Sequence, residues 1–185
     1  MVEALIKRNS KKHPQLNFPD YKSSCSRAPK NKKISFSSTS TEISGPVFNK
    51  NILGKLDNDL TLNFSKNNIS PIGHKIIVFG RISDQFSNPI EGALIEIWQA
   101  NAAGKYLHHN DNNSAPIDPN FAGCGRSITS SKGYYEFITI QPGPYPYPNR
   151  GIEWRPMHIH FSVFGKSFGQ RLITQMYFEG DPLIN

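Results

Sequence analysis

Residues 155–165 read RPMHIHFSVFG, and the order of their side chains sets the fold class that we expect for this 185-residue chain. Apolar and polar side chains alternate along it, Met157, Ile159, Phe161 and Val163 against His158, His160 and Ser162. A period of two is typical of a β-strand, in which side chains i and i+2 point to the same face. We therefore predict a strand with one apolar face and with both imidazoles on the other.

Two imidazoles on one strand face are also typical of a metal site that takes its other ligands from elsewhere in the fold. A pair of histidines on a solvated strand face is the plainer interpretation. Upstream of the pair lie Arg155, Tyr145 and Tyr147, and further back Tyr106, which favours the metal site. A cupin also uses His-x-His on a strand, but no glutamate follows closely here, which argues against that class.

Other parts of the chain also read as short strands separated by turns. Residues 75–84 and 93–101 are rich in Ile and flank a turn at Asn88-Pro89, so we expect them to pair as adjacent antiparallel strands. Residues 127–148 read as a further hairpin that turns near Gly133, and residues 170–178 read as a strand. This spacing predicts an all-β protein, a two-sheet β-sandwich of the prealbumin or immunoglobulin type.

A long segment without strand periodicity, residues 102–127, interrupts these strands. It is dense in Asn, Asp, Pro and Gly, and a loop of this length in a compact domain is usually functional or disordered. It carries Tyr106, His108, His109 and Arg126, so we expect a long irregular active-site loop. Outside the proposed site, we interpret Trp98 and Trp154 as core residues and His108, His109, His13 and His74 as solvated or structural.

The positive charge of the chain lies at its N-terminus. Residues 1–33 hold nine Lys and Arg against two acidic residues, which equals the net charge of +7 of the whole chain. We expect an extended basic arm and polar linker over residues 1–44, within which residues 34–44 are a linker or a polar edge strand, and a single domain over residues 45–185. Because only Phe18 and Tyr21 lie among these charges, and no run of stacking aromatic residues interleaves them, nucleic-acid binding is disfavoured against a solvated tail or a strap that docks on another subunit.

The spacing of the cysteines indicates a reducing compartment, and the hydropathy of the chain bears on its location. Cys25 and Cys124 have no C-x-x-C spacing, which is typical of free thiols rather than a disulfide framework or a zinc site. The first residues lack the apolar core of a signal peptide, and no run of apolar residues is long enough to cross a membrane. We therefore expect a cytoplasmic location.

Several long runs together resemble the intradiol ring-cleavage dioxygenases, and within them the iron-bearing β subunits that act on protocatechuate. These runs are GPVF (45–48), LDNDLTLN (56–63), IEIWQANAAGKY (95–106), APIDPNF (115–121), GRSITSSKGYYEF (125–137), IQPGPYPY (140–147), EWRPMHIHFSVFG (153–165) and QRLITQMYFEGDPLI (170–184). In the arm, FPDYKSS (18–24) and SRAP (26–29) are also similar to those subunits.

This resemblance implies a set of site residues. The expected Fe(III) ligands are Tyr106, Tyr145, His158 and His160, with Tyr145 the ligand that substrate displaces. Arg155 falls at the active-site arginine position and Gln175 beside it, and both are expected to be catalytic together with Tyr145. Tyr21, Tyr147 and Arg155 are expected to contact substrate. Tyr147-Pro148 stands where the family usually has Trp-Arg, which changes the wall of the pocket.

The resemblance further implies a reaction and partners. We expect a non-haem Fe(III) enzyme that uses O2 to cleave protocatechuate between its two hydroxyl-bearing carbons, giving 3-carboxy-cis,cis-muconate, and that assembles with an α subunit. A catechol-specific enzyme is disfavoured because residues 1–44 lack the helical dimerisation segment of those relatives. Family members continue past the position of Asn185, so we expect missing C-terminal strands, and a non-catalytic sandwich or an iron-binding remnant is the alternative.

Overall fold

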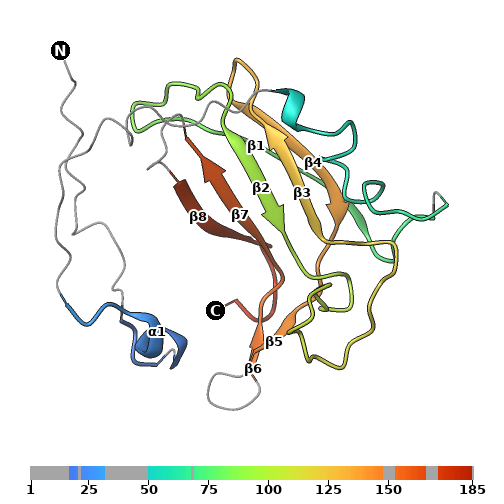
Figure 1. The fold of residues 1–185 in the computed structure, drawn as a ribbon. Helices are drawn as coiled ribbons and strands as arrows, with labels where there is room; N and C mark the ends of the chain where they lie inside the picture. Colours follow the sequence, from blue (N-terminus) through green and yellow to red (C-terminus); the bar gives the residue numbers. More distant parts are fainter. Residues whose placement is uncertain are drawn as a thin grey trace.

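The computed structural model describes residues 17–20, 22–31, 50–67, 69–147, 153–165 and 171–184. Eight strands make up most of the ordered structure (Figure 1), in chain order β1 Lys75–Arg81, β2 Leu94–Trp98, β3 Cys124–Ile128, β4 Tyr134–Ile140, β5 Tyr145–Tyr147, β6 Glu153–Arg155, β7 His158–Phe164 and β8 Arg171–Tyr177. Two short helical segments precede them, α1 Lys22–Arg27 and the 3-10 turn η2 Lys50–Ile52. The regular secondary structure of the described residues is thus almost entirely β, as the alternation predicts.

The strands form a main sheet, a smaller sheet that packs on it, and a separate hairpin. The main sheet has the order β3-β2-β7-β8, the smaller sheet pairs β1 with β4, and β5 pairs with β6 outside the sandwich. All of these pairings are antiparallel. In Figure 1 the β5–β6 hairpin projects from one end of the main sheet, next to the end at which β7 begins.

The core lies between the two sheets, so every second side chain of a core strand points into it. Ile95 and Ile97 of β2 and Ile159 of β7 turn toward Val78 of β1 and Phe137 of β4, and each of the five is less than a tenth exposed. Burying these side chains removes apolar surface from water on both sheets at once, which is the main favourable term in folding. The residues that alternate with them, including both histidines of β7, therefore occupy the outer face of the main sheet.

Two of the expected strand pairings are wrong. The strands β1 and β2 do not pair with each other, because β1 belongs to the smaller sheet and β2 to the main sheet. Val78 of β1 and the two isoleucines of β2 instead meet in the core between the sheets. The turn near Gly133 is present, with φ +78° at that glycine, but it joins β3 to β4 across the two sheets and not as a hairpin.

The N-terminal arm is described only in part. In Figure 1 helix α1 lies at the lower left, to the side of the β5–β6 hairpin. The expected linker or edge strand over residues 34–44 lies outside the described residues. Among the helices in the described ranges, none has the length and apolar character that crossing a membrane requires.

Candidate metal centre and active-site cavity

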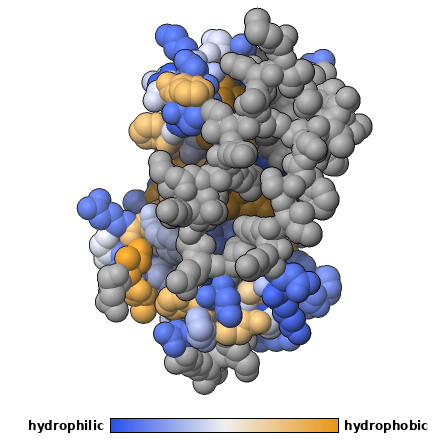
Figure 2. Space-filling view, turned by 90° about the vertical axis from the view of Figure 1, so that its left-hand side faces the viewer, coloured by the Kyte–Doolittle hydropathy of each residue, from blue (hydrophilic) through white to orange (hydrophobic). Residues whose placement is uncertain are grey.

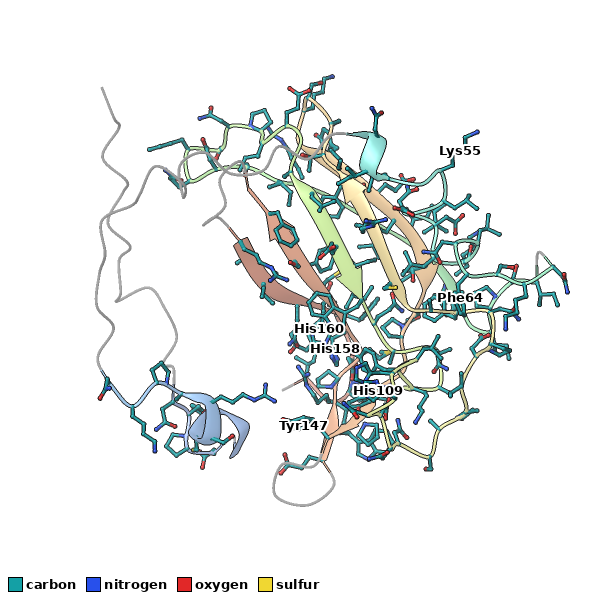
Figure 3. All side chains as sticks on the ribbon, viewed as in Figure 1. Lys55, Phe64, His109, Tyr147, His158 and His160 are labelled. Carbon is teal, nitrogen blue, oxygen red and sulfur yellow. The ribbon has the colours of Figure 1, made fainter. Side chains whose placement is uncertain are left out.

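The first two candidate ligands come from β7, the strand that pairs with β2 on one side and β8 on the other. Their rings lie on the same face with centroids 4.8 Å apart and nearly perpendicular planes, as the i, i+2 spacing predicts (Figure 3). His158 is buried, and the indole ring of Trp98 stacks on His160 at 4.7 Å between ring centroids. Neighbouring strands therefore fix both imidazoles in place.

The two tyrosines approach the histidines from other elements. Tyr106 lies in the loop between β2 and β3, and its hydroxyl is 3.5 Å from His158 Nε2. Tyr145 begins β5, and its ring meets the ring of Tyr106 edge-on at 5.1 Å between centroids. Two phenol oxygens and two imidazole nitrogens are thus brought together from a strand, a loop and a hairpin that are distant in sequence.

Hydrogen bonds within the loop hold Tyr106 in position. The Lys105 ammonium donates to the backbone carbonyls of Asp111, at 2.6 Å, and Asn113, and it forms an ion pair with the Asp111 carboxylate at 3.5 Å. The same carboxylate accepts the Tyr106 amide at 2.9 Å, and it lies close enough to Tyr145 to raise the pKa of that phenol. Asp111, whose side chain is 3% exposed, therefore holds the backbone of one candidate tyrosine ligand and influences the ionisation of the other. No periodic signal in the sequence marks it for this position.

The ionisation of these groups follows from their burial. Burial, with nearby His158 and Arg155, lowers the pKa of His160 to about 4. Burial and Arg155 also lower the pKa of His158. The hydrogen bond to the Pro156 carbonyl raises this pKa, but by less. Burial raises the pKa of Tyr106 to about 12 and that of Tyr145 above its usual value. The imidazoles are therefore neutral at pH 7, and the phenols ionise there only when a cation offsets the charge.

This donor set fits a hard, highly charged cation. Neutral imidazole nitrogens and phenol oxygens are both metal donors, and phenolate favours Fe(III) over Fe(II). Within the part of the chain that the structure describes, no group of three or more His, Cys, Asp and Glu side chains could hold a metal. The tyrosines are therefore needed to complete a set of four donors.

Arg155 and Gln175 meet beside this donor set, as their predicted positions require. The Arg155 guanidinium donates to Gln175 Oε1 and, at 3.3 Å, to the hydroxyl of Tyr177. Tyr177 in turn donates to Gln175 Oε1 at 2.6 Å. Gln175 lies directly across from His160 in the register of β7 and β8, so the side-chain cluster is fixed to the same sheet as the histidines.

A cavity of about 850 Å³ opens next to the candidate ligands. It is lined by Arg27, Tyr147, Glu153, Trp154, Arg155, Pro156, His160, Thr174, Gln175 and Tyr177. This volume suits a small-molecule site, for which about 300–1,000 Å³ is usual. Tyr147 is therefore in the cavity wall, whereas Tyr21 lies outside the described residues.

Arg27 of α1 also lines the cavity, and sequence reasoning missed it. The only available signal was the SRAP run in the arm, which carries no periodicity. The cavity wall therefore combines residues of the hairpin and of β8 with one basic side chain of the N-terminal arm.

Both tryptophans differ from the expectation that they are core residues. Trp154 is 55% exposed, because it lies on the β5–β6 hairpin, outside the sandwich, where no second sheet covers it. Trp98 lies on the outer face of β2, opposite to Ile95 and Ile97, and contacts His160. The alternation along β2 could have indicated this, since it places Trp98 and the buried isoleucines on different faces.

The remaining described residues that the sequence singled out make contacts of their own, and His13 lies outside the described residues. His108 and His109 are exposed and stack on each other at 4.5 Å between ring centroids. Arg126 is on β3 and forms an ion pair with Asp57 at 2.7 Å. Both cysteines are exposed free thiols, as expected. The long loop therefore contributes Tyr106, but not its histidines, to the site.

Comparison with known proteins gives the family. Residues 43–185 match the family model described as dioxygenase, and residues 6–39 match that of the protocatechuate 3,4-dioxygenase beta subunit N terminal. The chain is 48% identical over 180 residues to the protocatechuate 3,4-dioxygenase beta chain of Burkholderia cepacia, covering 97% of this chain and 76% of that protein. The chain belongs to the intradiol dioxygenase family. Members of this family use non-haem iron.

More distant intradiol dioxygenases match over shorter lengths. Catechol 1,2-dioxygenase 1 of Acinetobacter lwoffii is 35% identical over 120 residues, 59% of this chain and 37% of that protein. The structure of 3-chlorocatechol 1,2-dioxygenase from Rhodococcus opacus has a TM-score of 0.54 and 27% identity, and covers 77% of this chain and 57% of that one. Hydroxyquinol 1,2-dioxygenase from Pseudomonas putida has a TM-score of 0.52 and 26% identity, with coverage of 81% and 52%. The predicted sandwich fold is confirmed by these neighbours.

Proposed function

We propose that this chain is the iron-binding subunit of an intradiol dioxygenase that cleaves protocatechuate. We expect O2 to cleave the ring of protocatechuate between its two hydroxyl-bearing carbons. The expected product is 3-carboxy-cis,cis-muconate. The observation that carries the proposal is the convergence of Tyr106, Tyr145, His158 and His160 in a chain 48% identical to a protocatechuate 3,4-dioxygenase beta chain. Residues 45–185 would form the catalytic domain.

The four donors would hold Fe(III), which when bound supplies Lewis-acid chemistry toward a catechol. Tyr145 is the more accessible of the two phenols and lies on the short hairpin, whereas Tyr106 is anchored by its rigid loop. We therefore assign Tyr145 as the ligand that substrate displaces. Burial and the nearby Asp111 carboxylate raise the pKa of Tyr145, which favours the protonated phenol once Tyr145 is no longer a ligand.

Arg155 would act on charge that develops on the substrate ring. A guanidinium remains protonated at any working pH, and Gln175 together with Tyr177 holds it at the edge of the cavity. A fixed cation at this position lowers the energy of an electron-rich ring without reorganising during the reaction. Gln175 is a positioning residue in this account, because it accepts from Arg155.

The charges of the cavity wall support a substrate with a carboxylate. Arg27 and Arg155 both line the cavity, with Glu153 the only acidic residue in the lining that the structure describes. Protocatechuate carries a carboxylate that catechol lacks, so cationic side chains favour protocatechuate. Tyr147 would form part of the substrate wall. Tyr21 remains a proposed substrate contact on the basis of the resemblance alone.

We also propose an α subunit as partner. The chain is similar to a protein named as a beta chain, and this name implies a second, different chain in the same assembly. The similarity therefore supports a hetero-oligomer. Exposed apolar side chains on the outer strands offer surface for such a contact, including Leu172 and Ile173 of β8, 59% and 58% exposed. A surface of this kind on a sheet edge is an association site.

A ring-cleavage assay tests this function. The iron-loaded chain, with its α partner if required, is given protocatechuate or catechol in oxygenated buffer, and product is identified by mass spectrometry. We expect the mass of protocatechuate plus both oxygen atoms of O2, labelled when ¹⁸O2 is supplied, and slower reaction of catechol. Faster reaction of catechol would indicate a catechol-specific enzyme. Absence of product from either substrate, with iron bound, would indicate a non-catalytic iron-binding remnant.

A further inference from the structure

The Pro156–Met157 peptide links His158 by hydrogen bonds to the buried carboxylate of Asp181, which lies in the turn just after the C-terminal end of β8. We propose that Asp181 is a positioning residue that holds His158 in the tautomer and orientation needed for metal binding, acting through the Pro156–Met157 peptide. The inference rests on the proposed function in that His158 is taken as a metal ligand. Asp181 itself contacts none of the four donors in the hydrogen bonds described below.

The carboxylate of Asp181 is fixed by the turn that follows β8. The residue is 5% exposed, and its Oδ1 accepts the Leu183 amide at 2.9 Å. Its backbone accepts the Ile184 amide at 3.0 Å. Its Oδ2 reaches out of the turn and accepts the Met157 amide at 2.7 Å. A carboxylate held in this way by its own turn is a rigid, charged acceptor for one distant amide.

The other side of the same peptide faces the histidine. The Pro156 carbonyl lies 2.6 Å from His158 Nδ1. A carbonyl oxygen can only accept, so Nδ1 carries the ring proton and Nε2 keeps its lone pair. Nε2 is the atom that lies 3.5 Å from the Tyr106 hydroxyl, within the donor set. The hydrogen bond to Pro156 therefore selects the tautomer that can bind a metal through Nε2.

The Pro156 carbonyl and the Met157 amide belong to one planar peptide, which ties these two contacts together. Because the peptide is rigid, anchoring its N–H also fixes the direction of its C=O. A charged acceptor on the N–H further polarises the unit and strengthens the hydrogen bond that its oxygen accepts. Removing the charge of Asp181 should therefore loosen His158 without removing any ligand.

Asp118 provides a matched control in the same chain. It is 6% exposed, and it too accepts one amide from its own turn, Asn120 at 2.8 Å, and one distant amide, Ile72 at 2.7 Å. Neither amide belongs to a peptide that contacts a candidate ligand in the described hydrogen bonds. Asp→Asn at each position keeps the size of the side chain and removes the same charge and one acceptor, so only the effect on His158 should differ.

The first measurement uses the metal-free full chain at neutral pH. Long-range ¹H–¹⁵N spectra distinguish the two imidazole tautomers, and His158 is assigned by its absence in His158→Gln. We expect the Nδ1–H tautomer in the wild type and in Asp118→Asn, and a mixture of both tautomers in Asp181→Asn. We also expect the Met157 amide of the wild type to resonate far downfield, as a short charge-assisted hydrogen bond requires. If Asp181→Asn does not fold, an Nε2–H tautomer or an ordinary Met157 amide shift in the wild type would still overturn the proposal.

The second measurement is ferric iron binding in competition with citrate. Loss of a group that orients a metal ligand typically costs about 10–100-fold in affinity. We expect that loss in Asp181→Asn and no loss in Asp118→Asn. An Nε2–H tautomer in the wild type, unchanged tautomer and affinity in Asp181→Asn, or an equal loss in Asp118→Asn would each overturn the proposal. If the wild type bound no iron, the proposed function would fail, while the tautomer measurement would still test the link between Asp181 and His158.

Discussion

Two buried neutral imidazoles beside two phenols are the residues from which the candidate centre is built. Burial keeps His158 and His160 unprotonated at pH 7 without the help of a cation. The same burial disfavours the ionised form of Tyr106, so this phenol loses its proton at pH 7 only when a bound cation offsets the negative charge. Side chains in this arrangement are suited to a metal and poorly suited to an empty polar core.

His160→Ala should lose iron, whereas His108→Ala and His109→Ala should keep it. His160 is fixed between Trp98 and the donor set, while the loop histidines are exposed and contact each other. Iron content per chain, measured after purification and dialysis, checks this. Equal iron loss in the loop variants would mean that the wrong histidines were assigned.

Arg155→Ala should retain iron and lose turnover. Its guanidinium contacts Gln175 and Tyr177, so it is placed to stabilise charge and not to bind the metal. Removal of a fixed electrostatic group of this kind costs about 100–1000-fold in kcat. The measurement is kcat on protocatechuate at matched iron content, with exposed Arg81→Ala on β1 as the control. Wild-type turnover in Arg155→Ala would remove this residue from the mechanism.

At the scale of elements, the loop that carries Tyr106 and the strand that carries Tyr145 meet at Gly104. Its φ is +77°, and a Cβ there would lie 2.1 Å from the backbone oxygen of Pro144, immediately before Tyr145. Only glycine permits both this conformation and this approach. The relative position of the two tyrosines therefore depends on a residue with no side chain.

Gly104→Ala should destabilise the fold more than Gly92→Ala. Both glycines have a similar positive φ, which costs an alanine about 1–2 kcal/mol, but a Cβ at Gly92 meets nothing within 4 Å. Steric overlap at Gly104 adds about 1–3 kcal/mol. Urea unfolding of the metal-free variants measures the difference. Equal free energies of unfolding would contradict the close contact of loop and strand.

Sequence periodicity predicted the elements well and their partners less well. The alternation in residues 155–165 predicted β7, its apolar face and the shared face of the two histidines. It could not predict that β1 and β2 lie in different sheets. The alternation along a strand indicates that one of its faces is buried, but it does not indicate which strand covers that face. The contacts of Asp111 and Asp181 arise from a loop and a turn without a period, and Arg27 lies on a six-residue helix too short to show one, so these contacts appear only in three dimensions.

At the scale of the whole molecule, apolar side chains remain exposed on the outer strands of both sheets. Ile77 and Phe79 of β1 are 59% and 75% exposed, and Leu172 and Ile173 of β8 are exposed to a similar extent. Figure 2 looks onto the left-hand side of Figure 1 and shows hydrophobic residues interspersed with hydrophilic ones on the described part of this face. Neither β1 nor β8 has a strand partner on its outer side within the described residues.

Co-expression with a family α subunit should increase solubility and activity relative to the chain alone. Exposed apolar strand edges promote association, either with a partner or with other copies of the chain. Size-exclusion chromatography and the protocatechuate assay, each performed with and without the α subunit, measure the effect. A monodisperse and fully active homomer of this chain would show that the partner is not required.

The central claim is that Tyr106, Tyr145, His158 and His160 bind one ferric ion, and the iron content with the visible spectrum of the purified chain tests it most directly. Tyrosinate bound to Fe(III) gives a burgundy charge-transfer band. We predict one iron per chain, with that band present in the wild type, shifted in Tyr145→Phe and absent in His160→Ala. A colourless protein, or zinc as the stoichiometric metal after expression with ample iron, would contradict the account.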